Sequence, residues 1–107
     1  MARNVTEVEQ IAKQAIALLR ERIPVVQAYL FGSHLDGTAR DDSDIDIAAF
    51  SPAVENMPLE ARVDLMIKLE RQLDAPVELH LFGAKSLSEA RPTNFFGYLR
   101  AHGKPIG

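Results

Sequence analysis

Two short groups of residues in this chain stand at a spacing that could bring a phosphate and a metal ion together. Gly32-Ser33 is followed, after ten intervening residues, by Asp44-Ile45-Asp46. The glycine–serine pair closes one apolar run, and the aspartates open a second one. A phosphate-sized turn next to paired carboxylates predicts metal-dependent handling of a nucleoside triphosphate.

The aspartates are the stronger part of this pattern. Residues two apart in a strand point to the same side, so the carboxylates of Asp44 and Asp46 are expected to converge. Like charges at close range resist joint ionisation unless a cation lies between them, and oxygen ligands suit Mg²⁺. The alternative is a solvated turn, but Asp46 is flanked by Ile45 and Ile47 within an apolar segment.

Two better-known ion-binding motifs are excluded. An EF-hand that began at Asp42 would need glycine at its sixth position and glutamate at its twelfth, where this chain has Ile47 and Ala53. A P-loop would need Gly-Lys-Ser/Thr after a spaced glycine, which neither Gly32-Ser33 nor the segment 83–86 supplies.

The phosphate-binding half of the pattern is Gly32-Ser33. Glycine permits a close approach to the backbone, and free N–H groups at a turn favour phosphate, with the serine hydroxyl as a further donor. The pair is also common in ordinary turns, so its position directly after an apolar run is what supports this interpretation.

A third acid, Glu78, lies inside the apolar run Val77-Glu78-Leu79. An unpaired charge is costly in such a setting, so Glu78 is expected to join Asp44 and Asp46 if its strand lies beside theirs. The alternative is a glutamate that faces water from an edge strand. His80 shares a face with Glu78 by strand alternation, and a structural role or a place at the rim is the favoured interpretation for it.

The elements that must position these residues follow from hydrophobic periodicity and from the turn residues. A capping box, Asn4 with Glu7 or Thr6 with Glu9, begins the first helix. The expected order is a helix over 4–22, a strand over 25–31, a loop over 32–43, a strand over 45–50, a loop over 53–57, a helix over 58–73, a strand over 77–82, a helix over 86–101 with an interruption near Pro92, and a loose tail over 102–107. The expected fold class is α/β (α+β): one domain over 1–107, with a small mixed sheet and helices on one of its faces.

Composition narrows the class of protein. The chain is 47% hydrophobic and 25% charged, which is typical of a folded globular domain, and it has no cysteine for a disulfide or a thiolate site. It has no apolar stretch of transmembrane length and no signal peptide, so we expect a cytoplasmic protein without membrane contact. The net charge of −3 argues against direct binding of nucleic acid, which usually requires surplus lysine and arginine.

Gly32-Ser33, ten residues, Asp44-x-Asp46 and the later Glu78 together resemble the DNA polymerase β-type nucleotidyltransferase superfamily. The short length and the ending from Leu99 to Ile106 resemble its minimal nucleotidyltransferases, which are commonly antitoxin partners of HEPN-domain toxins. The resemblance covers essentially the whole chain.

The resemblance implies a polymerase β-like fold and transfer of AMP from ATP to a hydroxyl. It implies that Asp44, Asp46 and Glu78 are catalytic and hold two Mg²⁺ ions, and that Gly32 and Ser33 bind the triphosphate. Arg40 matches a basic position that is frequent before the aspartates and would face the phosphates; an exposed salt-bridging arginine is the alternative. The implied acceptor is a tyrosine of a HEPN-domain toxin. Both homo- and hetero-oligomers remain open.

The chain departs from the family pattern at two positions. Many relatives have an arginine in place of Asp36, and the third carboxylate, here Glu78, is often an aspartate. Two other functions stay as alternatives: a catalytically weak module that neutralises its partner by contact, and an antibiotic-type adenylyltransferase. The short chain leaves little for an acceptor domain, which favours an acceptor that a partner protein supplies.

Overall fold

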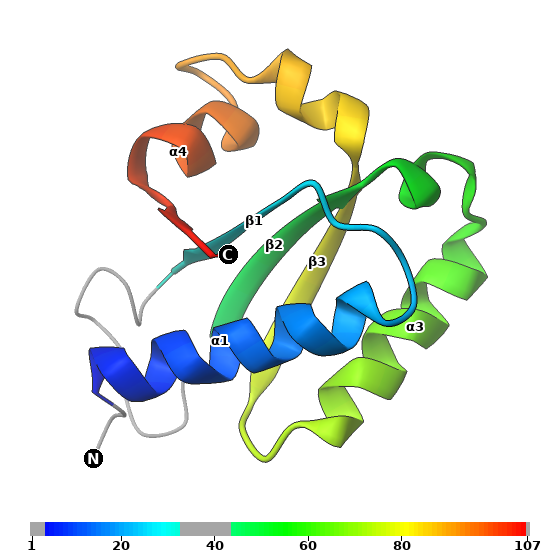
Figure 1. Cartoon of the computed structure of the whole chain (residues 1–107). Helices are drawn as coiled ribbons and strands as arrows, with labels where there is room; N and C mark the ends of the chain where they lie inside the picture. Colours follow the sequence, from blue (N-terminus) through cyan, green and yellow to red (C-terminus); the bar gives the residue numbers. More distant parts are fainter. Residues whose placement is uncertain (1–3, 33–43, 107) are drawn as a thin grey trace.

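The computed structural model describes residues 4–32 and 44–106 of the chain (Figure 1). The elements in these ranges are, in chain order, α1 (Val5–Arg20), β1 (Gln27–Phe31), β2 (Ile45–Ser51), the 3-10 helix η1 (Pro52–Asn56), α3 (Leu59–Gln72), β3 (Val77–Gly83), the 3-10 helix η2 (Ala84–Glu89), α4 (Phe95–His102) and β4 (Lys104–Pro105). The loop expected over 32–43 lies outside the described residues except for Gly32.

Helix α1 begins where the sequence predicts. The Asn4 side chain accepts a hydrogen bond from the backbone N–H of Glu7 at 2.8 Å and donates one to the Glu7 carboxylate at 2.9 Å. These bonds join the two residues of the first expected capping box, and the one from the Glu7 N–H satisfies a backbone donor that the helix start leaves unpaired. The buried face of α1 consists of Val8, Ala12, Ala15, Ile16 and Leu19.

The described strands form one four-stranded sheet in the order β3-β2-β1-β4. β1 and β2 are antiparallel, with Phe31 opposite Asp46. β2 and β3 are parallel, with Asp46 opposite Glu78, and η1 and α3 supply the crossover between them. The expected fold class, a mixed sheet with helices, is therefore confirmed, and the strand that carries Glu78 lies directly beside the strand that carries Asp46.

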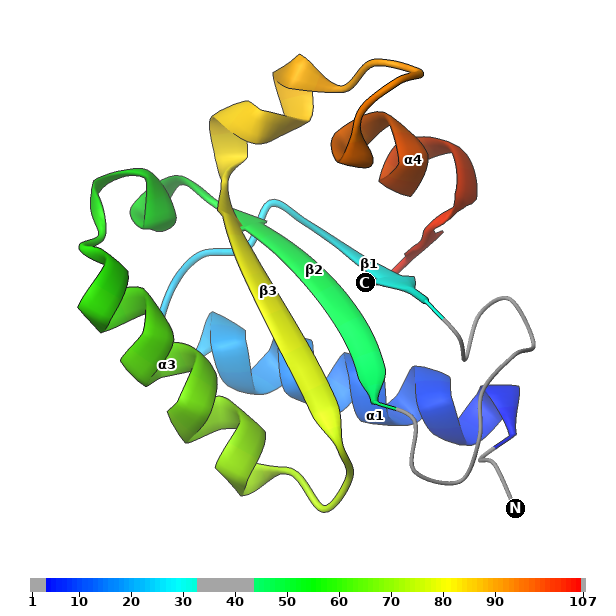
Figure 2. The same ribbon diagram turned by 180° about the vertical axis from the view of Figure 1, so that it is seen from behind.

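The two faces of the sheet have different cover (Figures 1 and 2). α1 and α3 lie on one face, where Ile45, Ile47 and Ala49 of β2 belong to an aliphatic core. Ala48 and Phe50 of the same strand belong to a second cluster on the opposite face. The expectation of helices on one face holds for the two long helices, and the short α4 covers part of the other face.

Two expectations about the segments after β2 and β3 are wrong. Residues 53–57 are not a plain loop, because η1 occupies Pro52–Asn56, where Ser51 Oγ accepts from the N–H of Ala53 at 3.1 Å. The single helix expected over 86–101 is divided into η2 and α4. The N–H of Gly97 donates to Asn94 Oδ1 at 2.9 Å, so a new helix start follows Pro92.

The tail that was expected to be loose is part of the sheet. β4 pairs with β1 through Tyr29 and Leu30, and the N–H of Ile106 donates to the carbonyl of Ala28 at 2.9 Å. Ile106 is only 6% exposed and belongs to the aliphatic core. One apolar residue directly after Lys104-Pro105 is a weak signal in the sequence, since only the neighbouring β1 edge shows where it can be buried.

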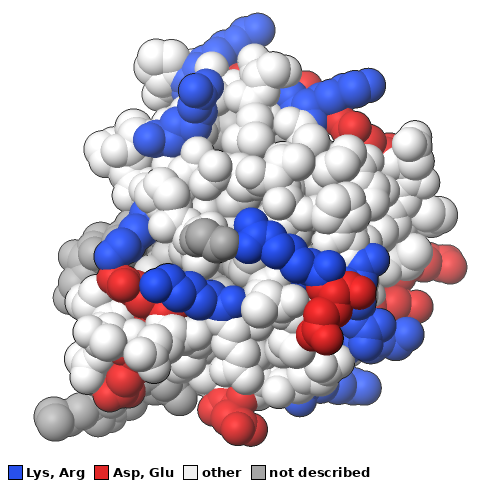
Figure 3. Space-filling model, in the orientation of Figure 1, with Lys and Arg blue, Asp and Glu red and all other residues white. Residues whose placement is uncertain are grey.

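None of the helices within the described ranges is long and apolar enough to cross a membrane. On the face of the molecule drawn in Figure 3, acidic and basic side chains are interspersed around a broad uncharged area. A mixture of both signs over a surface is typical of a solvated exterior.

Candidate functional site

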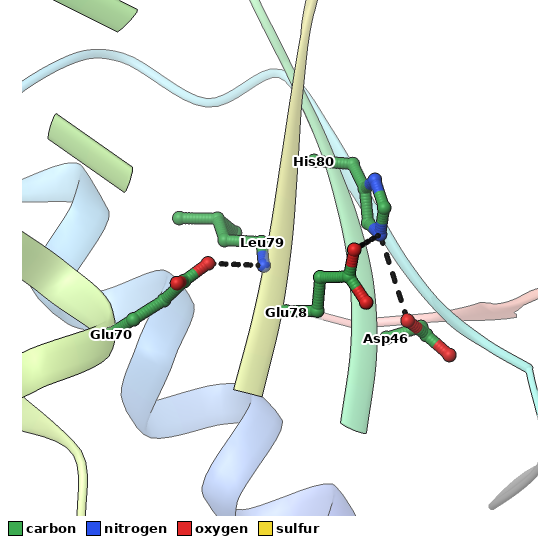
Figure 4. A network of polar contacts seen from close by, with 5 residues as sticks. All are labelled: Asp46, Glu70, Glu78, Leu79 and His80. Atoms are coloured by element: carbon green, nitrogen blue, oxygen red, sulfur yellow. Dashed lines mark hydrogen bonds and ion pairs between the residues drawn. The ribbon is translucent and has the colours of Figure 1, made fainter. Parts of the chain in front are cut away.

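Three ionisable side chains converge on the sheet face that α4 partly covers. The parallel register sets Asp46 of β2 beside Glu78 of β3, and His80 follows two residues later on the same face. His80 Nε2 lies 3.6 Å from Asp46 Oδ1 and 3.8 Å from Glu78 Oε1. One donor atom from each of the three residues falls within 4.8 Å of the others, as Figure 4 shows.

The sheet geometry explains this convergence. Alternate residues of a strand share a face, so Glu78 and His80 must point away from the aliphatic core that Val77, Leu79 and Leu81 enter. The same alternation turns Asp46 away from that core between the buried Ile45 and Ile47. The apolar residues thus determine the direction of the polar ones.

Asp46 is under electrostatic strain. Its side chain is 22% exposed, and its pKa is raised above the usual 3.8, first by burial and next by the negative charge of Glu78. His80 acts in the opposite direction and does not offset these effects, and Asp44 adds to the rise. A carboxylate that is held near another in partial burial favours a cation between them.

Gly32 closes one side of the site. Its φ is +88°, a value that side chains of L-residues rarely tolerate, and a Cβ at this position would come within 2.3 Å of Asp46 Oδ2. The group that lies close to the backbone here is the Asp46 carboxylate, and the predicted binding of a phosphate at Gly32 stays a prediction. Only glycine fits there while Asp46 keeps this orientation.

β3 is held at its outer edge by a residue that the sequence analysis did not single out. Glu70 of α3 accepts a hydrogen bond from the backbone N–H of Leu79 at 2.9 Å, on the opposite side of β3 from the cluster (Figure 4). Leu79 lies between Glu78 and His80 in the chain. The hydrogen bond therefore fixes the segment that presents both side chains.

The predicted site residues have different positions. Asp46 and Glu78 come together, and Asp44 is exposed just before β2 and is not among the three residues whose donor atoms meet. Ser33 and Arg40, and Asp36 with them, lie outside the described residues. His80, expected to be structural or at the rim, lies within this cluster with its side chain 31% exposed, on the same face as Glu78 as strand alternation predicts.

The donor set fits a divalent cation. Asp46 and Glu78 offer carboxylate oxygens from adjacent strands, which are ligands that Mg²⁺ and similar ions accept.

Comparison with known proteins gives a family. The family model "Polymerase beta, Nucleotidyltransferase" matches residues 13–91. Over 65 residues the chain is 46% identical to the protein adenylyltransferase MntA of Shewanella oneidensis, a match that covers 60% of this chain and 45% of that protein. The match thus spans less than half the length of this relative.

Solved structures share the fold. A toxin–antitoxin structure with AMP-PNP is 33% identical with a TM-score of 0.64, over 89% of this chain and 72% of that one. The MntA–HepT toxin–antitoxin structure is 29% identical with a TM-score of 0.59, over 92% and 71%. A protein from Sulfolobus solfataricus, at 21% identity, has a TM-score of 0.61 over 78% and 73%, a likeness of fold alone.

Proposed function

This chain belongs to the polymerase beta nucleotidyltransferase family, and on that premise we propose that it transfers AMP from ATP to a hydroxyl group of a partner protein. The observation that carries the proposal is the pairing of Asp46 with Glu78 on adjacent parallel strands beside the tight turn at Gly32. The relative in Shewanella oneidensis is a protein adenylyltransferase, and one structural relative contains AMP-PNP. Because ATP is the proposed substrate, the proposed site of the reaction is the cytoplasm.

The proposed acceptor is a tyrosine of a HEPN-domain toxin, so the chain would be the antitoxin of a toxin–antitoxin pair. The structural relatives at 29% and 33% identity are toxin–antitoxin structures, and the minimal nucleotidyltransferases that the sequence resembles are commonly partners of such toxins. The tyrosine hydroxyl would enter on the open side of the Asp46–Glu78 pair, since the exposed fraction of Glu78 is 53%.

The proposed metal is Mg²⁺, as two ions that Asp44, Asp46 and Glu78 hold. When bound, the ions would neutralise charge on the phosphate oxygens and favour deprotonation of the acceptor hydroxyl. Asp46 occupies the centre of this arrangement, because it faces Glu78 across the strand pair and follows Asp44 by two residues. Its raised pKa supports a role as a ligand whose charge a cation must balance.

Gly32, Ser33 and Arg40 are the proposed triphosphate-binding residues. The backbone at Gly32 turns with a positive φ directly after β1, and the absence of a side chain lets the Asp46 carboxylate lie close to this turn. A triphosphate held at the turn would therefore lie beside the proposed metal ligands. In the transfer, the acceptor oxygen attacks the α-phosphorus and the bond to the β-phosphate oxygen breaks. Pyrophosphate leaves, and the hydroxyl proton passes to solvent. Positioning and charge neutralisation supply most of the rate.

Label transfer from α-labelled ATP tests the proposal. The chain is incubated with Mg²⁺ and a HEPN-domain toxin, and the labelled protein is identified together with its modified residue. Asp44→Ala/Asp46→Ala should abolish transfer, since the loss of metal ligands exceeds the about 10–100-fold effect of removing their outer-shell partners. The charge-matched control is Asp64→Ala/Asp74→Ala, two exposed aspartates that do not belong to the cluster, which should transfer at the normal rate.

The same variants distinguish catalysis from neutralisation by contact. Complex formation with the toxin is measured by size-exclusion chromatography, and toxicity by growth of cells that express both proteins. If the chain neutralises the toxin by catalysis, the Asp44/Asp46 variant should still bind the toxin and fail to suppress its toxicity. Label transfer that survives in this variant, or full suppression without transfer, would refute the proposed function.

A further inference from the structure

His80 has an imidazole nitrogen without a hydrogen-bond partner at the centre of the carboxylate cluster. Among the described residues, Nε2 is one of two buried side-chain nitrogen or oxygen atoms that lack a partner. Its nearest charged groups are Asp46 Oδ1 and Glu78 Oε1, at 3.6 and 3.8 Å. These separations are longer than a hydrogen bond, and a buried unpaired nitrogen in a native site requires an explanation.

The separations match those between ligands of one metal ion. Ligands at about 2.1 Å from a metal stand about 3.0 Å apart at an octahedral edge and about 3.4 Å apart at a tetrahedral edge. The two distances from Nε2 exceed the tetrahedral edge by a few tenths of an ångström, and all three donor atoms lie within 4.8 Å of one another. A small rotation of the side chains would let one ion contact all three.

The imidazole is also held in the orientation that a ligand needs. The ring of Phe31 packs against it with centroids 5.3 Å apart, and Phe95 packs edge-on against Phe31 at the same centroid distance. Glu70 fixes the backbone of β3 one residue before His80 through its hydrogen bond to Leu79. Figure 4 shows Nε2 directed toward both carboxylates. A preoriented donor loses less entropy on binding an ion.

We propose that His80 is a metal ligand and that, in the nucleotide-free protein, Asp46, Glu78 and His80 form a mixed nitrogen–oxygen site that binds a first-row transition-metal ion more tightly than Mg²⁺. Imidazole suits borderline ions, and affinity for a given nitrogen–oxygen site rises from Mn²⁺ through Co²⁺ to Ni²⁺. Mg²⁺ prefers oxygen ligands and keeps its water. The inference rests on the proposed function only in taking Asp46 and Glu78 as metal ligands, and it does not require that AMP is transferred.

Binding of Mn²⁺, Co²⁺, Ni²⁺ and Mg²⁺ to the nucleotide-free protein tests this directly. Affinities are measured by calorimetry, and pulsed electron paramagnetic resonance of bound Mn²⁺ detects coupling to an imidazole nitrogen. His80→Phe keeps a ring against Phe31 and removes the donor, and His80→Gln is a smaller second variant. Both should lower the affinity for Co²⁺ and Ni²⁺ by about tenfold or more, remove the nitrogen coupling and leave Mg²⁺ binding unchanged.

The matched control is His102→Gln, because His102 is exposed on α4 and packs on Tyr98 away from the cluster. It should bind every ion as the parent does and keep the nitrogen coupling. Circular dichroism and thermal unfolding establish that each variant is folded before its affinities are compared. Absence of nitrogen coupling in the parent, or coupling that persists in both His80 variants, would overturn the inference.

The experiment separates this inference from the proposed function. Transition-metal binding through His80 in a protein that transfers no AMP would support the inference and refute the enzyme. AMP transfer that depends on Asp46, in a protein whose Mn²⁺ shows no nitrogen coupling, would do the reverse.

Discussion

The two faces of β2 show how one strand serves both stability and chemistry. Ile45 and Ile47 point into an aliphatic core under α1 and α3, and both are fully buried. Asp46, between them, points to the opposite face, toward Glu78 and His80. The strand is therefore fixed in register by one set of side chains and presents the other set at defined positions, because a shift by one residue would exchange the two faces.

The face with the carboxylates is itself uneven. At one end Phe50 stacks on Phe82 with centroids 5.4 Å apart, and Phe96 closes on both from α4. At the other end Phe31 packs against His80, where the ionisable cluster begins. α4 thus seals the aromatic end and leaves the ionisable end accessible. Substitutions on the aliphatic face of the sheet should therefore change stability, and substitutions at the ionisable end of the other face should change metal binding and activity.

The largest expected effect on stability is that of Ile47→Ala on the aliphatic face. Ile47 is 0% exposed, and truncation of such a side chain costs about 2–5 kcal/mol in unfolding free energy. Urea denaturation measures this loss, and label transfer per folded molecule should stay normal. The control is Ile67→Ala, the same change at a residue of α3 that is 40% exposed, where the loss should be much smaller. Equal losses at the two positions would contradict the assignment of the core.

Gly32→Ala tests the contact between the Gly32 backbone and the Asp46 carboxylate, which bears on both stability and metal binding. A non-glycine residue at φ +88° costs about 1–3 kcal/mol, and the added methyl group would also displace the Asp46 carboxylate. We expect lower stability in urea denaturation together with weaker binding of divalent ions. In the double variant Gly32→Ala/Asp46→Ala the contact is absent and only the backbone strain remains, so the two changes should not be additive in unfolding free energy. Additivity would show that Gly32 and Asp46 do not interact.

The sequence predicts the central part of this fold well, because the signals there are local. The apolar runs of β1, β2 and β3 are bounded by glycine or proline, and α1 carries its own capping box at Asn4 and Glu7. The last third is less predictable. Pro92 indicates an interruption, but the length of α4 depends on the Asn94 cap, and the pairing of β4 depends on a β1 edge that is distant in the chain.

The candidate site divides in the same way. The pairing of Asp46 with Glu78 is predictable, since two acids in neighbouring apolar strands have few other arrangements. That His80 belongs to the cluster is not predictable from the sequence. Strand alternation gives the face on which a residue lies but not the direction of its ring, which Phe31 and the β3 backbone determine. The hydrogen bond of Glu70 cannot be predicted for a similar reason, because the sequence of a helix does not show which backbone N–H its glutamate will contact.

Glu70→Ala probes the restraint behind the cluster and has a smaller expected effect. Loss of its hydrogen bond to the Leu79 N–H should lower the unfolding free energy by about 1 kcal/mol. Glu55→Ala is the matched control, because Glu55 accepts a hydrogen bond from the backbone N–H of Lys85 at the same distance of 2.9 Å. Both variants should lose similar stability in urea denaturation. Only Glu70→Ala should weaken Co²⁺ binding in calorimetry. An equal effect of both variants on Co²⁺ binding would show that Glu70 does not position the residues of the site.

The smallest expected effect is a pH dependence that belongs to the ionisable end alone. The pKa of Asp46 is raised in the folded protein, first by burial and then by Glu78, so the folded state holds this proton to a higher pH than the unfolded state does. Below about 3.8 both states are protonated and stability is unaffected. As pH rises from there through the folded pKa, the folded state binds more protons than the unfolded one, and stability must fall.

In metal-free protein, the unfolding free energy of Asp46→Asn relative to the parent should therefore increase over this interval and then level off. Urea denaturation in EDTA from pH 4 to pH 7 measures this difference in unfolding free energy. Saturating Mg²⁺ should remove the higher stability of Asp46→Asn, because the bound cation balances the charge of Asp46 in the parent. An advantage that is independent of both pH and metal would mean that Asp46 carries no electrostatic strain.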